Sequence, residues 1–184
     1  MNDESSIKGQ IIRQGGEVAA IIVAAVLLQW QWSSGWMSPH AFCLVVLAVA
    51  FGKTVFFFVE NLTHILMATR DNMAYHKVLG LMGVNMAQIT LSFALDYWCL
   101  EVAEPASFSS IETSWSQPEL VFEFFFFSVL NFSFFGFGDV TPLTVPAKLV
   151  TMMEVLLAFF TVIFLLSDFV SLKDSLRVRK RHED

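Results

Sequence analysis

The sequence is poor in cysteine, since its 184 residues include only Cys43 and Cys99. Two cysteines exclude a disulfide-rich scaffold and a four-cysteine zinc site within one chain. Both lie near predicted helix ends, where buried free thiols are favoured over a disulfide. His64 and His76 lack metal-ligand spacing, and the serines, histidines and acids form no nucleophile constellation. The sequence therefore predicts a protein that is not an enzyme and holds no covalent or organic cofactor.

Charged residues are also scarce, at 15% of the chain, and the net charge is −6. No basic groove with interleaved aromatic residues is present, which excludes nucleic acid as a partner. The basic residues gather instead at the C-terminal end: Lys173, Arg177, Arg179, Lys180 and Arg181. A basic cluster of this kind typically sets which side of the membrane the adjoining segment faces.

Hydrophobic residues are abundant, at 55% of the chain with 20 phenylalanines and a mean hydropathy of +0.61. A soluble domain with this content would expose large apolar patches. Several windows approach the roughly 20 apolar residues that span a bilayer. The sequence therefore predicts an all-α, multi-pass membrane protein with the lipid bilayer as a partner.

Four apolar segments are expected to span, at residues 18–32, 41–66, 77–100 and 146–172. The first resembles a signal peptide but lacks a small-residue cleavage site, so we expect it to be retained. A polar lead-in precedes it at 1–17, polar links lie at 67–76 and 101–117, and a basic tail follows at 173–184. With four spans both termini share one side, and the distribution of basic residues makes that side cytoplasmic. This compact layout is compatible with a bacterial inner membrane.

A fifth apolar segment, residues 118–131, is too short to span. At about 1.5 Å per residue its helix measures about 20 Å, against a hydrocarbon core of about 30 Å. Ser116 and Glu119 have the spacing of a capping box, and Pro118 suits the first helical turn. We therefore expect a re-entrant helix that starts after Ser116 and returns toward the same membrane face.

The residues after this helix, 133–139, read SFFGFGD. Glycines 136 and 138 can adopt backbone angles that are closed to other residues. Alternating left- and right-handed angles would turn successive carbonyls to one side, where a column of carbonyls can replace the water around a cation. The expected ion-binding residues are Ser133, Phe134, Phe135, Gly136, Phe137 and Gly138.

This stretch resembles the filter of the tetrameric potassium-channel superfamily, usually Thr-Val-Gly-Tyr-Gly-Asp, and Phe127, Ser128 and Val129 fit the pore-helix pattern of that family. The resemblance implies a homotetramer that conducts potassium or another monovalent cation passively. It also implies that Asp139 supports the filter at its outer mouth. It assigns residues 77–172 to a pore domain: outer helix 77–100, pore helix 118–131, filter 133–139 and inner helix 146–172. Residues 18–76 form an additional two-helix hairpin.

The inner half of the motif departs from that family. Phe134 stands where the family has a threonine that offers both a carbonyl and a hydroxyl, and Phe135 replaces a valine. Leu130 occupies a position where some members carry a buried acid. Three outcomes stay open: potassium selectivity with a weaker inner site, altered cation selectivity, or a non-conducting scaffold or regulatory subunit.

The remaining candidates lie inside the spans. Lys53 is expected to make an intramembrane polar contact, with Gln88 at similar depth and Asn85, Glu60 and Glu154 as other possible partners. Glu154 is expected to form an interhelical hydrogen bond rather than an ion site. Phe159, Phe160 and Phe164 are candidates for a hydrophobic gate, with simple packing as the alternative. The first two spans lack arginines at every third residue, so no voltage sensor is expected, and no ligand-gating domain is expected after the pore.

Overall fold

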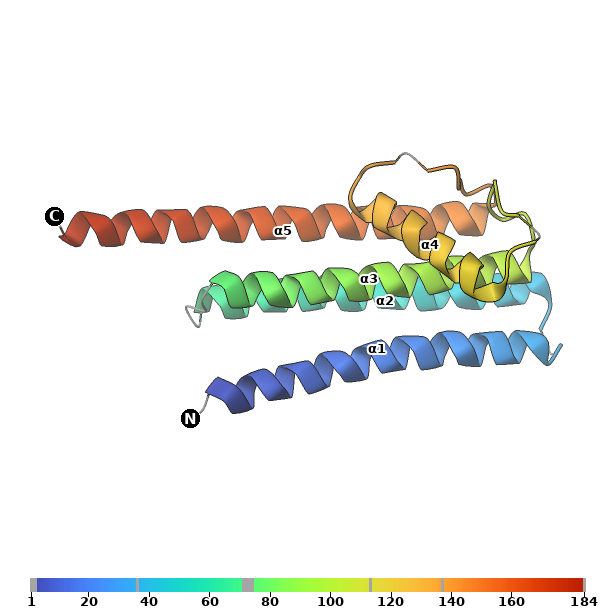
Figure 1. Cartoon of the computed structure of the whole chain (residues 1–184), viewed down its shortest axis with the longest axis horizontal. Coiled ribbons are helices and arrows are strands. Elements are labelled where there is room, and N and C mark those ends of the chain that lie inside the picture. The colour runs from blue at the N-terminus through green and yellow to red at the C-terminus, as the bar shows by residue number, and fades with distance from the viewer. Residues whose placement is uncertain (1–2, 36, 71–74, 113, 137, 184) are drawn as a thin grey trace.

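Five α-helices form the described part of the chain, and four of them lie side by side along its length (Figure 1). They are α1 (Asp3–Ser33), α2 (Pro39–Arg70), α3 (Tyr75–Ala103), α4 (Gln117–Phe132) and α5 (Val145–Glu183). The computed structural model describes the backbone at residues 3–35, 37–70, 75–112, 114–136 and 138–183. It describes side chains at 16–35, 37–63, 79–112, 114–136 and 138–166. The start of α1 and the end of α5 lie at one end of the bundle, and the connections around α4 lie at the other (Figure 1).

Three helices are apolar and long enough to cross a membrane in the part of the chain that the structure describes. The candidate spans are Gly16–Ser33, Pro39–Thr63 and Val145–Leu166. The third expected span, within α3, is not among them. It carries five buried polar residues: Asn85, Gln88, Thr90, Ser92 and Asp96. Because α3 packs against α1, α2, α4 and α5, these side chains face protein.

The two terminal helices are longer than the apolar segments predicted. α1 begins at Asp3, so the expected polar lead-in at 1–17 is mostly helical. α5 continues to Glu183, so residues 173–183 of the expected basic tail are helical. No proline falls inside 3–33 or 147–183, so nothing in either sequence forces the helix to stop at the end of its apolar part.

The chain enters and leaves the region of the short helix α4 at the same end of the bundle, which is the course that a re-entrant helix would take. The helix starts at the loop end of the bundle, crosses α3 obliquely, and the chain then returns to the same end before α5 begins (Figure 1). Its bounds, Gln117–Phe132, lie one residue beyond the expected 118–131 at each side. The capping box is confirmed, since the backbone N–H and the hydroxyl of Ser116 both donate to Glu119 Oε2 at 2.7 Å.

Aromatic rings fix α4 against α3. Tyr97 of α3 is fully buried between Phe124 and Phe127 of α4, with ring centroids 6.2 and 5.1 Å away. Phe108, from the loop after α3, closes the cluster at 4.9 Å from Phe124 and 5.4 Å from Tyr97. Edge-to-face and tilted contacts of this kind add to the energy of apolar burial. The cluster therefore holds the start of the re-entrant segment to the bundle.

Candidate functional site

The backbone of the SFFGFGD segment leaves α4 through two left-handed residues. Phe134 has φ of 57° and Gly136 has φ of 62°, separated by Phe135. The alternation was expected from glycines 136 and 138, but the left-handed residues are 134 and 136, so the expectation is wrong at Gly138 and one left-handed position is a phenylalanine. A bulky residue in this region is uncommon and costs on the order of 1 kcal/mol. Phe137 lies outside the described residues.

Gly138 has a different role from Gly136. Its φ is not left-handed, but a Cβ at this position would lie 3.2 Å from Leu130 Cδ1. Gly136 has open space around it, so it is the backbone angle that favours glycine there. The two glycines thus meet two requirements: a left-handed turn at 136 and a close approach to α4 at 138.

Ser133 caps α4 and uses its hydroxyl there. Its Oγ donates to Val129 O at 2.8 Å and lies 3.2 Å from Leu130 O. The hydroxyl of Ser133 is therefore engaged by carbonyls of α4 and does not point toward the candidate ion path. The next two amides also stay with the helix, since Phe134 N donates to Asn131 O at 3.2 Å and Phe135 N to Leu130 O at 3.0 Å. The rings of Phe134 and Phe135 are 48% and 66% exposed.

The outer loop after α3 clamps the chain that follows Asp139. Ser109 N donates to Thr141 O at 2.9 Å, and Thr141 N donates to Ser109 Oγ at 3.0 Å. Leu143 N donates to Ser107 O at 2.8 Å. The Ser109 hydroxyl also reaches the carbonyl of Asp139, at 3.2 Å. The outer end of the candidate filter is therefore tied to a loop that is remote in sequence.

Glu101 of α3 holds the backbone of that loop through hydrogen bonds. It belongs to α3 and is buried, whereas the sequence analysis placed it in the polar link at 101–117. Its two carboxylate oxygens accept from Ala106 N at 2.9 Å and Phe108 N at 3.0 Å. Burial raises the pKa of Glu101 above its usual 4.5, against the opposing effect of these backbone hydrogen bonds. Ala106, at φ of 69°, is held in its strained conformation by this contact.

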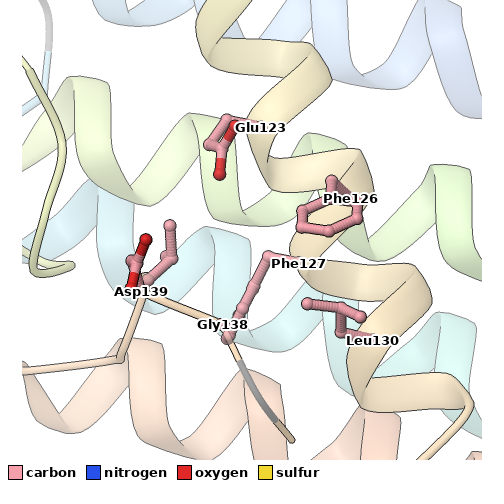
Figure 2. A pocket seen from close by; sticks show the side chains of 7 residues that line it. Glu123, Phe126, Phe127, Leu130, Gly138 and Asp139 are labelled. Atoms are coloured by element: carbon pink, nitrogen blue, oxygen red, sulfur yellow. The ribbon is translucent and has the colours of Figure 1, made fainter. Parts of the chain in front are cut away.

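A cavity of about 380 Å³ lies between α4 and the returning chain (Figure 2). Glu123 of α4 and Asp139 both point toward it, and Leu130 and Gly138 line its inner part. Phe126, Phe127 and Val140 complete the lining. The structure thus places the expected outer acid, Asp139, across from a second carboxylate that the sequence did not single out.

Glu154 is completely buried where α3, α4 and α5 meet. Tyr97 Oη donates to Glu154 Oε2 at 2.5 Å, and Asn131 Nδ2 donates to the same oxygen at 3.4 Å. The hydroxyl of Ser128 lies within hydrogen-bonding distance of both Glu154 Oε1 and Thr90 O. Glu154 of α5 therefore makes interhelical hydrogen bonds to both α3 and α4. Sequence reasoning did not identify Tyr97, Ser128 or Asn131 as its partners.

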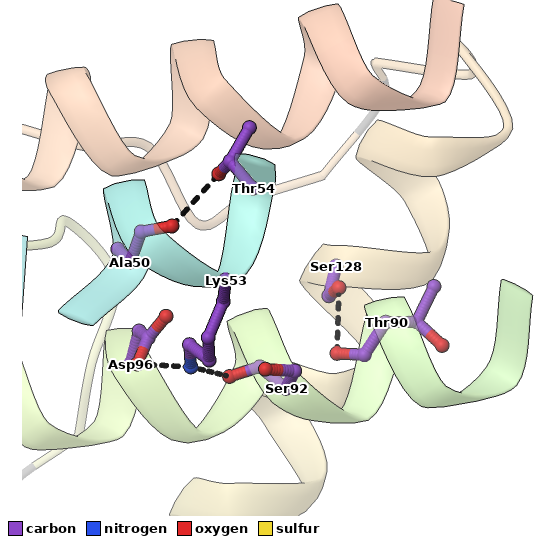
Figure 3. Close-up of polar contacts among 7 residues, drawn as sticks. All are labelled: Ala50, Lys53, Thr54, Thr90, Ser92, Asp96 and Ser128. Carbon is purple, nitrogen blue, oxygen red and sulfur yellow. Dashed lines mark hydrogen bonds and ion pairs between the residues drawn. The ribbon is translucent and has the colours of Figure 1, made fainter. Parts of the chain in front are cut away.

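Lys53 of α2 pairs with Asp96 of α3 (Figure 3). Its Nζ lies 2.7 Å from Asp96 Oδ1 and 3.3 Å from Ser92 O. The partners expected from depth were wrong: Gln88 donates instead to Glu17 of α1, at 3.3 Å. Side chains on a helix lean toward its N-terminus, so the long lysine of α2 reaches further toward the loop end than its Cα indicates. A usable signal existed, because Asp96 is the only acid in 77–100 and Lys53 the only lysine or arginine in 41–66.

A second buried polar link joins α2, α3 and α5. Asn85 Nδ2 donates to Asn61 Oδ1 at 2.6 Å, and Asn61 Nδ2 donates to Thr161 Oγ1 at 2.8 Å. All three side chains are buried. Together with the Lys53–Asp96 pair, this link attaches the additional hairpin to the region proposed as the pore.

Two of the three candidate gate residues face the hairpin. The rings of Phe160 and Phe164 lie 5.3 and 5.8 Å from the ring of Phe58 in α2. Phe159 is 52% exposed and belongs to a different face of α5. That face is a stripe of exposed apolar residues at helical spacing: Met152, Leu156, Phe159, Ile163 and Leu166. Packing on α2 therefore accounts for Phe164 and for part of Phe160, which is still 40% exposed.

Comparison with known proteins matches part of the chain to a protein family. Residues 85–173 match the model of a family described as ion channel. The match covers most of α3, all of α4, the SFFGFGD segment and the greater part of α5. No curated protein and no solved structure matched the chain. The matched region and the apolar helices support an ion channel function for this membrane protein, with residues 85–173 as a channel-like pore module.

Proposed function

We propose that the chain is one subunit of a homotetrameric channel that conducts potassium or another monovalent cation through a pore lined by residues 133–139. The observation that carries the proposal is the course of the chain around that segment. A capped helix enters from the loop end, the chain turns through left-handed residues 134 and 136, and it returns to the same end. Irregular backbone at membrane depth is tolerated where it is buried in protein or lines a water-filled path.

Exposed apolar surface on one chain supports assembly. Phe122 and Phe126 of α4 are 67% and 48% exposed, and the apolar stripe of α5 is also uncovered. One chain supplies only one filter strand, and four strands are needed to surround an ion. Neighbouring subunits cover the α4 surface in this proposal, and the α5 stripe with Phe159 faces the central path. The α3 helix, whose polar residues face protein, serves as the fourth span.

The orientation follows from charge. Both helical ends of the chain lie opposite the candidate filter, and the basic residues after position 172 lie at that end of α5. The positive-inside rule then makes both termini cytoplasmic and the α4 loops external. Cations enter the candidate filter from the side that carries Asp139 and Glu123.

Cation flux into liposomes tests the proposal. The purified chain is reconstituted, and potassium and sodium uptake are measured separately, with anion flux as the reference. Gly136→Ala imposes a side chain on a left-handed residue and is expected to reduce flux at least tenfold. Gly52→Ala, in the open surroundings of α2, is the matched control and keeps wild-type flux. Absence of cation flux from the wild-type chain under every gradient contradicts the proposal and favours a non-conducting scaffold.

A further inference from the structure

Glu154 is a buried carboxyl group with three hydrogen-bond partners near the candidate filter, yet it lies outside the proposed ion path. It projects from α5, while its partners belong to α3 and α4. A carboxyl group surrounded by apolar helices is costly unless hydrogen bonds satisfy it. Three side chains meet that need here, so the cluster joins three helices at one point.

The position of these partners on α4 is informative. Ser128 and Asn131 lie in the last turns of α4, directly before the cap at Ser133. The carbonyl of Asn131 accepts from Phe134 N at 3.2 Å, and the neighbouring Leu130 O accepts from Phe135 N at 3.0 Å. Glu154 is thus linked to the left-handed turn through one residue of the pore helix.

The opposite side of the same turn offers no comparable polar support. Leu130, which faces Gly138, is apolar and contacts it only by van der Waals packing. The rings of Phe134 and Phe135 are substantially exposed and do not anchor the turn to their own subunit. Within the described residues, the polar anchor of the end of α4 is therefore the Glu154 cluster together with the bond from Ser128 Oγ to Thr90 O at 2.9 Å.

We propose that Glu154 is the positioning residue of the candidate filter: from α5 it holds Ser128 and Asn131, and thereby fixes the backbone course of residues 133–136. The inference rests on the proposed function for its meaning but concerns a contact that can be tested without ion flow. In this inference α5, through Glu154, gives the turn the polar support that the apolar Leu130 of α4 does not give.

The experiment measures hydrogen exchange at the amides of Ser133, Phe134 and Phe135 in the full chain, together with the potassium-to-sodium flux ratio. Glu154→Leu removes every hydrogen bond of the cluster, and Tyr97→Phe removes a single one. Thr161→Val is the matched control, because it removes a buried hydrogen bond between α5 and α2 and leaves α4 untouched. Loss of hydrogen bonds to a buried carboxyl group is expected to speed exchange about tenfold.

Faster exchange at these three amides in Glu154→Leu and Tyr97→Phe, but not in Thr161→Val, supports the inference. A changed flux ratio in the same two variants connects it to ion selectivity. Ser128→Ala combined with Tyr97→Phe should give less than the sum of the two single effects, because both act through Glu154. If Glu154→Leu does not fold, Tyr97→Phe and Ser128→Ala decide the outcome.

Two results overturn the inference. The first is unchanged exchange in the cluster variants, and the second is an equal increase in Thr161→Val, which would show general loosening of α5. A wild-type protein without cation flux contradicts the proposed function alone, because the exchange measurement still decides whether Glu154 positions the turn.

Discussion

Lys53 Nζ lies 2.7 Å from Asp96 Oδ1, and this pair joins the additional hairpin to the helix that precedes the re-entrant segment. The side chain of Asp96 is 4% exposed and that of Lys53 is 20% exposed. Removing one partner leaves an uncompensated charge among apolar helices, which costs about 3 kcal/mol. We therefore expect Lys53→Met and Asp96→Leu each to lower the free energy of unfolding by about that amount.

Reversible unfolding in mixed detergent measures this effect. The double variant Lys53→Met with Asp96→Leu removes both charges and should recover most of the loss. Two single losses that simply add in the double variant would show that the pair is not coupled.

Two substitutions of Phe134 separate the effect of a hydroxyl at this position from the effect of side-chain shape. Phe134→Thr adds a hydroxyl and Phe134→Val adds the same branched shape without it, so both variants meet the same left-handed φ. Their difference therefore reports the hydroxyl alone. We expect Phe134→Thr to conduct potassium several-fold better than Phe134→Val and better than wild type, as measured by liposome flux. Equal potassium flux and ion occupancy in Phe134→Thr and wild type would contradict this prediction.

The start of α4 is expected to depend on pH. Hydrogen bonds from the Ser116 hydroxyl and backbone N–H hold the pKa of Glu119 below its usual 4.5. Because this pKa is lowered in the folded chain, the stabilisation is present above pH 4.5 and is lost as the pH falls through the lowered pKa. Carboxyl-carbon NMR should show the low pKa, and Ser116→Ala should raise it. An unchanged titration in Ser116→Ala would exclude the capping box as the cause.

Glu101 should control the order of the outer loop. Glu101→Gln keeps one acceptor but turns an amide donor toward a second backbone N–H, which costs about 1 to 3 kcal/mol. We expect faster hydrogen exchange at Ala106 and Phe108, whose amides donate to this carboxylate. Glu104→Gln is the matched control on the neighbouring turn and should leave both amides unchanged. Equal exchange rates at these two amides in Glu101→Gln and Glu104→Gln would show that Glu101 does not control the order of the loop.

The re-entrant helix and its loop were predictable because their signals are local. Ser116, Pro118 and Glu119 mark the start of α4, and the length of the apolar run rules out a span. The glycine at 136 likewise indicated a left-handed turn before the structure was known. These features depend on neighbours within a few residues, which a sequence shows directly.

Contacts between distant residues were not predictable in the same way. Lys53 was expected to lie level with Gln88 of α3 but pairs with Asp96, because counting Cα positions ignores the direction in which a long side chain extends. Phe160 and Phe164 were considered for a gate, but which face of α5 meets α2 is decided by packing. Glu101 was assigned to the polar link at 101–117 because nothing in the sequence shows that α3 continues to Ala103.

If residues 133–139 line the pore, a side chain at position 134 should be accessible from the ion path, and thiol labelling can test this. Phe134→Cys introduces a thiol at a half-exposed position, while Cys43 and Cys99 are buried and free. A thiol-reactive cation added to a bilayer should then block potassium current in Phe134→Cys. It should leave wild type and Phe51→Cys, a variant at an exposed position of α2, unaffected. Normal current after complete labelling of Phe134→Cys would contradict the account.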